Sequence, residues 1–221
     1  MRIIRNKKEE KLHMQKYKLI NGIGKNENIN SVIDDLLSIE QSSWDDKMQV
    51  GRENLIKRLE IFPDGLCRLV DSKNNKTLSY LYFILLDEST ILSMKTWDNI
   101  TGEGTASTHN NNGDAIFGVT LGSKKVGYGR LILQEAIKDF RKNKKFNSVK
   151  NIYLCGRIPS LSKYYNKFTK PEDIDFDKVL EDTTICIFRS AGFNVSELVY
   201  GGYEVDKYSL GYSALLRQSL L

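Results

Sequence analysis

Apolar residues recur at helical spacing in two segments of the N-terminal half. Residues 31–43 place Val32, Leu36 and Ile39 on one face, and residues 52–59 repeat the same amphipathic pattern. Both segments have the length of ordinary globular helices. The pattern therefore predicts two helices, one after the other, before any strand begins.

A β-hairpin is predicted after the turn at residues 63–65, Pro-Asp-Gly. Two apolar runs, residues 66–70 and 78–86, flank a polar segment over residues 72–76. Short apolar runs joined by a polar turn are typical of paired antiparallel strands.

The second half alternates between strand and helix patterns. It predicts, in order, a strand over residues 114–121, a helix over 131–140, a strand over 149–155, a helix over about 177–191, a strand ending at 200 and a terminal strand over 208–216. Neither a repeat nor a second domain is apparent. The fold class is therefore α/β, with a single mixed layer of strands and flanking helices.

Residues 95–113 break this regular alternation. The stretch holds glycines, threonines and three consecutive asparagines, yet it also carries Trp97 and His109. Long loops inside compact domains are usually functional or disordered. Because Trp97 and His109 are unusual residues for a mere linker, we expect this loop to contribute to a functional site.

Composition indicates a globular protein that buries a sizeable core. The 221 residues are 40% hydrophobic and 28% charged. No apolar run reaches the roughly 18–20 residues that a membrane span requires, and the N-terminus lacks a signal-peptide pattern. We therefore expect a soluble, cytoplasmic protein without a membrane span.

The formal charge of +5 comes from the N-terminus. Residues 1–18 contain seven bases and two acids, so the remaining 26 bases balance the remaining 26 acids. We therefore expect a basic arm over residues 1–16 and one domain over residues 17–221. A neutral body disfavours a nucleic-acid-binding protein, and we expect no nucleic acid among its partners.

Cysteine and histidine are too few and too scattered to predict a metal site. Cys67, Cys155 and Cys186 lie far apart in apolar contexts, and the chain has only two histidines, His13 and His109. Zinc and redox motifs need close pairs of such ligands. We expect no metal, and buried structural roles for the cysteines.

The segment from Val119 to Leu133 indicates an anion site. A strand runs into a loop with Gly127 and Gly129, and a helix follows at once. Convergent backbone N–H groups and a helix N-terminus favour phosphate at such a turn. The spacing fits neither the dinucleotide fingerprint nor the P-loop, so an ordinary glycine-bearing turn remains the alternative.

This segment resembles the coenzyme-A loop of the GNAT acyltransferase superfamily, whose pattern is Arg/Gln-x-x-Gly-x-Gly/Ala. Lys124 takes the Arg/Gln position, which keeps the charge but loses the planar fork. The resemblance covers roughly residues 17–216. Further matches point to a branch whose members are sometimes fused to carbon–nitrogen hydrolase domains; they are Trp97, Thr101, Gly102, Gly104, His109, Gly113, Asp114, Gly156, Arg157, Pro159, Tyr164, Asp206, Ser209, Gly211 and Tyr212.

The resemblance implies a single-domain GNAT-like fold, with a mixed, mostly antiparallel sheet whose fourth and fifth strands splay apart. It also implies an acyltransferase that moves an acyl group, acetyl above all, from acetyl-CoA or another acyl-CoA to a primary amine. The implied coenzyme-A contacts are Phe117, Val119 and Leu121 for the pantetheine arm and Lys124, Lys125, Val126, Gly127, Tyr128, Gly129 and Arg130 for the pyrophosphate. A longer acyl chain, a catalytically quiet coenzyme-A-binding module and a homodimer all remain open.

The catalytic side chains are less well specified. The thiolate-protonating tyrosine of the superfamily is replaced here by Phe188, and Tyr164 is a substitute candidate. His109 and Glu103 are candidates for the base that deprotonates the amine. Trp97 and Arg157 are candidates for substrate contact, and Arg157 could equally organise its loop.

Overall fold

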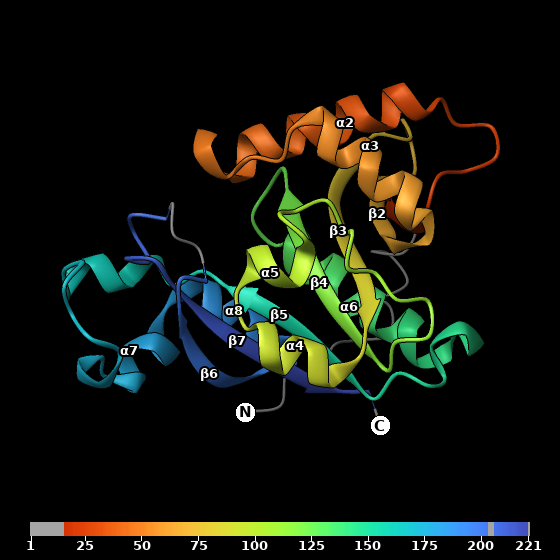
Figure 1. Ribbon diagram of the computed structural model, residues 1–221. Coiled ribbons are helices and arrows are strands. Elements are labelled where there is room, and N and C mark those ends of the chain that lie inside the picture. Colours follow the sequence, from red (N-terminus) through yellow and green to blue (C-terminus); the bar gives the residue numbers. More distant parts are fainter. Residues whose placement is uncertain (1–15, 203–205, 221) are drawn as a thin grey trace, which may run out of the picture.

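The structure is a computed structural model, which describes residues 16–202 and 206–220. Its centre is a seven-stranded mixed sheet with the order β1-β2-β3-β4-β5-β7-β6 (Figure 1). Every neighbouring pair is antiparallel except β4 and β5, which run parallel. The strands are β1 (Tyr17–Asn21), β2 (Leu66–Asp71), β3 (Thr77–Leu86), β4 (Ala115–Ser123), β5 (Asn151–Gly156), β6 (Asn194–Tyr200) and β7 (Tyr212–Ser219). The predicted α/β class is confirmed.

Helices cover both faces of this sheet. The α-helices are α2 (Ile29–Ser43), α3 (Arg52–Ile61), α4 (Glu88–Met94), α5 (Trp97–Thr101), α6 (Tyr128–Lys142), α7 (Phe176–Glu181) and α8 (Thr183–Ser190). Short 3-10 turns are η1 (Asp46–Met48), η2 (Pro63–Gly65), η3 (Lys144–Phe146), η4 (Pro159–Lys163) and η5 (Pro171–Asp173). The basic arm predicted over residues 1–16 lies, apart from Lys16, outside the described residues.

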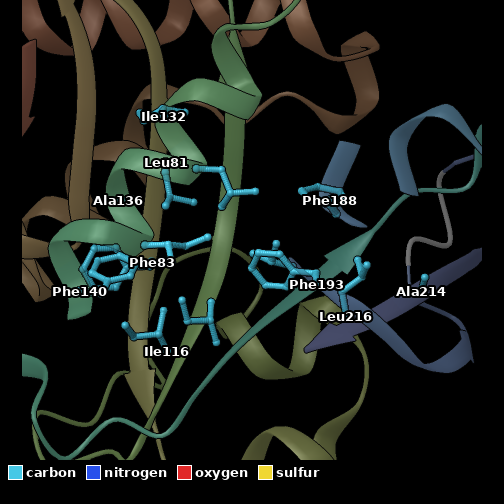
Figure 2. Packing of buried hydrophobic residues seen from close by; sticks show 14 of the residues in the cluster. Leu81, Phe83, Ile116, Ile132, Ala136, Phe140, Phe188, Phe193, Ala214 and Leu216 are labelled. Atoms are coloured by element: carbon cyan, nitrogen blue, oxygen red, sulfur yellow. The ribbon is translucent and has the colours of Figure 1, made fainter. Parts of the chain in front are cut away.

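The two faces bury separate cores because side chains alternate along each strand. On one face Leu81 and Phe83 of β3 pack against Ile132, Ala136 and Phe140 of α6, as Figure 2 shows. On the other face, the alternate residues of β3 and β4 pack against α2 and α3. The sheet therefore separates an α6 face from an α2–α3 face.

Several elements differ from the sequence prediction, among them α4, which the prediction lacked. The helix expected over residues 177–191 is two helices, because Asp182 turns its carboxylate onto the backbone N–H groups of Thr184 and Ile185 and starts α8 anew. The terminal strand begins at Tyr212 rather than at residue 208. The sequence prediction also lacked β1, which forms the sheet edge by pairing with β2.

Strands β4 and β5 diverge after a short parallel ladder. Their pairing joins Ala115–Gly118 to Asn151–Leu154 and ends there (Figure 1). A Cβ atom on Gly118 would lie 2.2 Å from Cδ2 of Leu154, so a larger residue at the last paired position would require the Leu154 side chain to move. Beyond this position, no strand of the described residues pairs with the edge of β4 that faces β5, and the predicted splay of the fourth and fifth strands is confirmed.

Candidate functional site

A β-bulge marks the point where β4 leaves β5. The register between β3 and β4 shifts between Tyr82 and Phe83, which pair with Thr120 and Gly118, so Val119 has no partner on β3. The indole N–H of Trp97 donates to the Val119 carbonyl oxygen at 2.8 Å. Bulges re-aim side chains and release backbone groups from a ladder. Here the bulge presents the backbone of Val119 at the opening of the splay.

The bulge also brings Val119 and Thr120 into the wall of one cavity. This cavity has a volume of about 300 Å³ and lies on the α2–α3 face. Trp97 and Glu103 line it as well, so the structure brings together two of the predicted site residues from the segment 95–113. That segment is not an irregular loop throughout, since α5 begins at Trp97 behind a Thr96 cap.

A buried polar chain forms the floor of the cavity. The guanidinium of Arg58 donates from Nη1 to Thr120 Oγ1 at 2.9 Å and from Nε to the Gly104 carbonyl at 2.7 Å. The Tyr80 hydroxyl donates to Glu40, whose other carboxylate oxygen accepts the Val50 N–H at 2.9 Å. Burial raises the pKa of Glu40, and the hydrogen bonds from Tyr80 and Val50 oppose that shift.

Sequence reasoning missed Glu40 and Arg58, although a signal was present. Arg58 falls between Leu55 and Leu59 on the apolar stripe of α3, and Glu40 follows Leu36 by four residues on the stripe of α2. Both are almost fully buried. A charged residue on the buried face of an amphipathic helix is a candidate for a site.

The glycine loop lies where the sequence placed it, between β4 and α6. Gly127 caps α6 with φ +93°, a left-handed conformation that favours glycine, and a Cβ there would meet nothing within 4 Å. The first turn of α6 leaves the N–H groups of Gly129 and Arg130 without intrahelical acceptors. Lys125, Val126 and Arg130 are exposed around it.

A hollow of about 290 Å³ adjoins this loop; its walls are Tyr17, Val126, Gly127, Tyr128, Arg130, Leu131 and Gln134. Lys124 is tied to the sheet by its N–H, which donates to the Leu78 carbonyl at 2.9 Å. Exposed N–H groups at a helix N-terminus, with lysine and arginine beside them, have the chemistry of a phosphate site.

The three residues predicted to contact a pantetheine arm do not share one environment. Val119 and Leu121 lie beyond the parallel ladder, on the free edge of β4. Phe117 pairs with Tyr153 inside the ladder and is fully buried. Because its backbone is already used within the sheet, Phe117 differs from the expected edge position.

The structure does not bring His109 to the cavity. Its Nδ1 accepts the Leu85 N–H at 3.1 Å, its Nε2 is 3.0 Å from Asn111 Oδ1, and its ring stacks on Phe62 at 3.9 Å. Phe62 belongs to the core of the α6 face. Burial lowers the pKa of His109. Both ring nitrogens are engaged in holding the loop, on the opposite face from Trp97.

Tyr164 is also separate from the cavity. It is 55% exposed, and its ring packs against Tyr165 and beneath the Lys178 ammonium. Phe188 is buried beside β5, where a Cβ on Gly156 would approach its ring at 3.4 Å. The position at which a tyrosine was expected therefore lies at the splay, but the Phe188 side chain there has no proton to donate to a thiolate.

Arg157 organises the loops at the end of β5. Its guanidinium grips Asp206 with two bonds, Nε to Oδ2 at 2.7 Å and Nη2 to Oδ1 at 2.9 Å. Asp206 also accepts the Ser209 hydroxyl, and Ser209 accepts the Ile158 N–H. This network joins the two segments that the sequence had singled out around Arg157 and Asp206.

Within residues 16–202 and 206–220, no three His, Cys, Asp or Glu side chains gather as metal ligands would. Helices in the same part of the chain are all too short or too polar to cross a bilayer. Burial raises the pKa of Cys67 and of Cys155 to about 12, as expected for inert core thiols. Cys186 is exposed on α8, so the expectation of a buried role was wrong for this cysteine.

No protein-family model matches the sequence. A probable hydrolase of Bacillus subtilis, YhcX, is 29% identical over 150 residues, which are 65% of this chain. The chain spans only 28% of the length of that relative. The match agrees with the predicted likeness to domains that occur together with hydrolases.

Solved structures resemble the whole domain. The GphF GNAT-like decarboxylase in complex with isobutyryl-CoA aligns with a TM-score of 0.73 at 16% identity, covering 92% of this chain and all of that chain. The loading GNATL domain of CurA from Lyngbya majuscula gives 0.72 at 16% identity, covering 92% and 98%. The ribosomal-protein-S18-alanine N-acetyltransferase of Escherichia coli gives 0.53 at 11% identity, covering 92% and 94%. The chain therefore has the GNAT fold.

Proposed function

We propose that the protein binds an acyl-CoA in the splay between β4 and β5 and transfers its acyl group to a primary amine. The observation that carries this proposal is the bulge at Val119, which lies between two sites on opposite faces of the sheet. The glycine loop opens α6 on one face, and the cavity lies on the other. Two ligands could thus meet at Val119 from opposite sides.

The donor occupies the α6 side. The N–H groups at Gly127, Gly129 and Arg130 bind its pyrophosphate, and the pantetheine arm follows the free edge of β4. The thioester carbonyl accepts a hydrogen bond from the backbone N–H of Val119, which stabilises the oxyanion as it forms. Trp97 supports this arrangement because it holds the carbonyl of the same residue at 2.8 Å.

The acceptor occupies the cavity on the α2–α3 face. Its ammonium loses a proton to Glu103 at the cavity wall or to water, and the amine nitrogen then attacks the thioester carbon. The C–N bond forms, the C–S bond breaks, and the second proton lost by the amine nitrogen passes through water to the leaving thiolate. A thiolate needs less help than an alkoxide because its conjugate acid has a pKa near 8.5. This suits a site with Phe188 at the tyrosine position.

Release of free thiol tests the proposal. Purified protein is mixed with acetyl-CoA, longer acyl-CoAs and a panel of amines, and thiol formation is followed with a colorimetric reagent. Amine-dependent release that disappears in Gly127→Glu supports acyl transfer. Binding of acyl-CoA without release by any amine would leave a catalytically quiet coenzyme-A-binding module instead.

Decarboxylation of a carboxyacyl-CoA is a second candidate. It is favoured by the higher TM-scores with the GphF decarboxylase and the CurA loading domain, 0.73 and 0.72, than with the S18-alanine N-acetyltransferase, 0.53. In this reaction the C–C bond to the carboxylate breaks, carbon dioxide leaves, and the α-carbon takes a proton. Loss of carbon dioxide from such a thioester without any amine would identify it.

A further inference from the structure

Arg58 is buried in an unusual way. Its side chain is 1% exposed, lines the cavity, and uses Nε and Nη1 on two neutral acceptors, the Gly104 carbonyl and the Thr120 hydroxyl. Among the described residues, no carboxylate forms an ion pair with it and no acceptor is bonded to Nη2. Arginine stays protonated in proteins, so a full charge sits there without a contacting counter-ion.

Two other arginines of this protein have the carboxylate partner that Arg58 lacks. Arg68 is also 1% exposed, and it forms an ion pair with Glu27. Arg157 is 15% exposed and holds Asp206 with a two-pronged contact. Removing charge from water is unfavourable unless a partner compensates it. Arg58 alone among these three lines the cavity and lacks a contacting carboxylate; the Tyr82 ring, 5.7 Å from its Cζ, is its aromatic neighbour.

Glu40 does not supply the missing contact. Its two carboxylate oxygens accept from the Tyr80 hydroxyl and the Val50 N–H, and it forms no ion pair with Arg58. The other charged groups of the cavity are Lys47, Asp98 and Glu103, and all three are exposed. The guanidinium of Arg58 is therefore the buried cationic group at the floor of the cavity.

We propose that the acceptor carries a carboxylate beside its amine, as an α-amino acid does, and that Arg58 binds this carboxylate through Nη2. The inference rests on the proposed acyl transfer and names the class of its acceptor. A carboxylate fits because arginine recognises it with parallel N–H bonds. The acidic Glu103 at the cavity wall suits the ammonium at the other end of such a molecule.

The position of Thr120 supports the same assignment. Thr120 accepts from Arg58 Nη1 at 2.9 Å and directly follows Val119, the residue assigned to the thioester carbonyl. A carboxylate on Arg58 therefore lies next to the reacting centre. An amine separated from that carboxylate by one or two carbons can reach the thioester, and a cavity of about 300 Å³ accommodates a molecule of this size.

The experiment compares matched acceptors on the wild-type protein. An α-amino acid and its carboxamide have the same amine and side chain and differ in the charge of one end. We expect kcat/KM for the acid to exceed that for the amide by about 10- to 100-fold, the range of one hydrogen bond to a charged group. Equal kcat/KM values for acid and amide would overturn the inference while leaving acyl transfer intact.

Variants of Arg58 test whether this residue causes the preference for the acid over the amide. Arg58→Lys keeps the charge and loses the fork, and Arg58→Met removes both; acyl-CoA affinity reports whether each variant is folded. The acid-over-amide ratio of kcat/KM should fall toward one in Arg58→Met, because the acid loses more of its kcat/KM than the amide does. A folded variant with an unchanged ratio would overturn the role of Arg58. If the variants do not fold, an amine-free carboxylate analogue must compete with the acceptor on wild type, and failure to compete would overturn the inference.

A further experiment tests whether the carboxylate that Arg58 binds belongs instead to the acyl group of the donor. Succinyl-CoA and butyryl-CoA are compared with a neutral amine as acceptor. If Arg58 binds the carboxylate of the acceptor, its substitution leaves the ratio of kcat/KM between these two donors unchanged. If the ratio between donors collapses in Arg58→Met instead, the carboxylate belongs to the acyl group and the acceptor assignment is wrong. Absence of thiol release with every amine would contradict the proposed function itself.

Discussion

Replacement of Trp97 by phenylalanine tests the link between the bulge and the cavity. The substitution keeps an aromatic ring but removes the N–H that donates to the Val119 carbonyl at 2.8 Å. Losing one hydrogen bond and leaving a buried carbonyl without its partner together amount to about 2 kcal/mol. For a chain of this size that corresponds to a Tm lower by roughly 4–8 °C.

A matched control exists in the same cavity. Trp44 also lines it, but its indole nitrogen is buried without a hydrogen-bond partner among the described residues. Trp44→Phe removes the same atoms and no hydrogen bond, and an aromatic ring remains beneath the Arg157 guanidinium. The difference in Tm between the two variants, measured by calorimetry, isolates the bond to Val119 from the loss of ring volume.

Activity provides the second readout. If Trp97 fixes the backbone that polarises the thioester, Trp97→Phe should lower kcat by about 10-fold and leave acyl-CoA affinity unchanged. Trp44→Phe, which changes the same cavity but no hydrogen bond to Val119, should lower kcat less than Trp97→Phe does. Equal losses of Tm in both variants, together with unchanged kcat in Trp97→Phe, would refute the idea that this bond positions the site.

Three further predictions concern the glycine loop, His109 and Asp206. Gly127→Glu should abolish acyl-CoA binding in calorimetry without unfolding the protein, because its side chain would enter the space for phosphate, whereas Gly127→Asn should still bind since asparagine tolerates positive φ. His109→Ala should lower Tm but change kcat/KM far less than the roughly 100-fold expected for a lost general base, because both ring nitrogens are already bonded. Burial lowers the pKa of His109, so the unfolded chain binds protons first and stability should fall as pH drops below 6.5; this slope should flatten in the alanine variant. Burial alone would raise the pKa of Asp206, but hydrogen bonds from Arg157 and Ser209 lower it overall, so stability should be lost as pH falls through and below 3.8, and urea unfolding of Asp206→Asn should show a weaker acid dependence.

The fold could be predicted well from the sequence because its elements are strongly periodic. The hairpin of β2 and β3, the strand β4 and the helix α6 all lie within a few residues of their predicted positions. The predicted boundaries were wrong where a single polar side chain determines where a helix begins. Asp182 divides one apolar helical pattern into α7 and α8 by capping the second helix, which periodicity alone does not reveal.

The site could be predicted only in part, since its geometry depends on register and on the two faces of the sheet. Gly127 was predicted correctly as a turn glycine because its backbone conformation favours that residue. The bulge at Val119 depends on the pairing between β3 and β4, so no local pattern encodes it. His109 follows Trp97 by only twelve positions, yet the chain crosses to the opposite face between them.

A crystal structure of the protein with a bound acyl-CoA tests the central claim most directly. The account predicts the pyrophosphate on the N–H groups from Gly127 to Arg130, the pantetheine arm along the free edge of β4, and the thioester carbonyl at the N–H of Val119. The acyl group should point toward the cavity of Trp97 and Arg58. An acyl-CoA bound away from the splay, or with its carbonyl remote from Val119, would contradict the account.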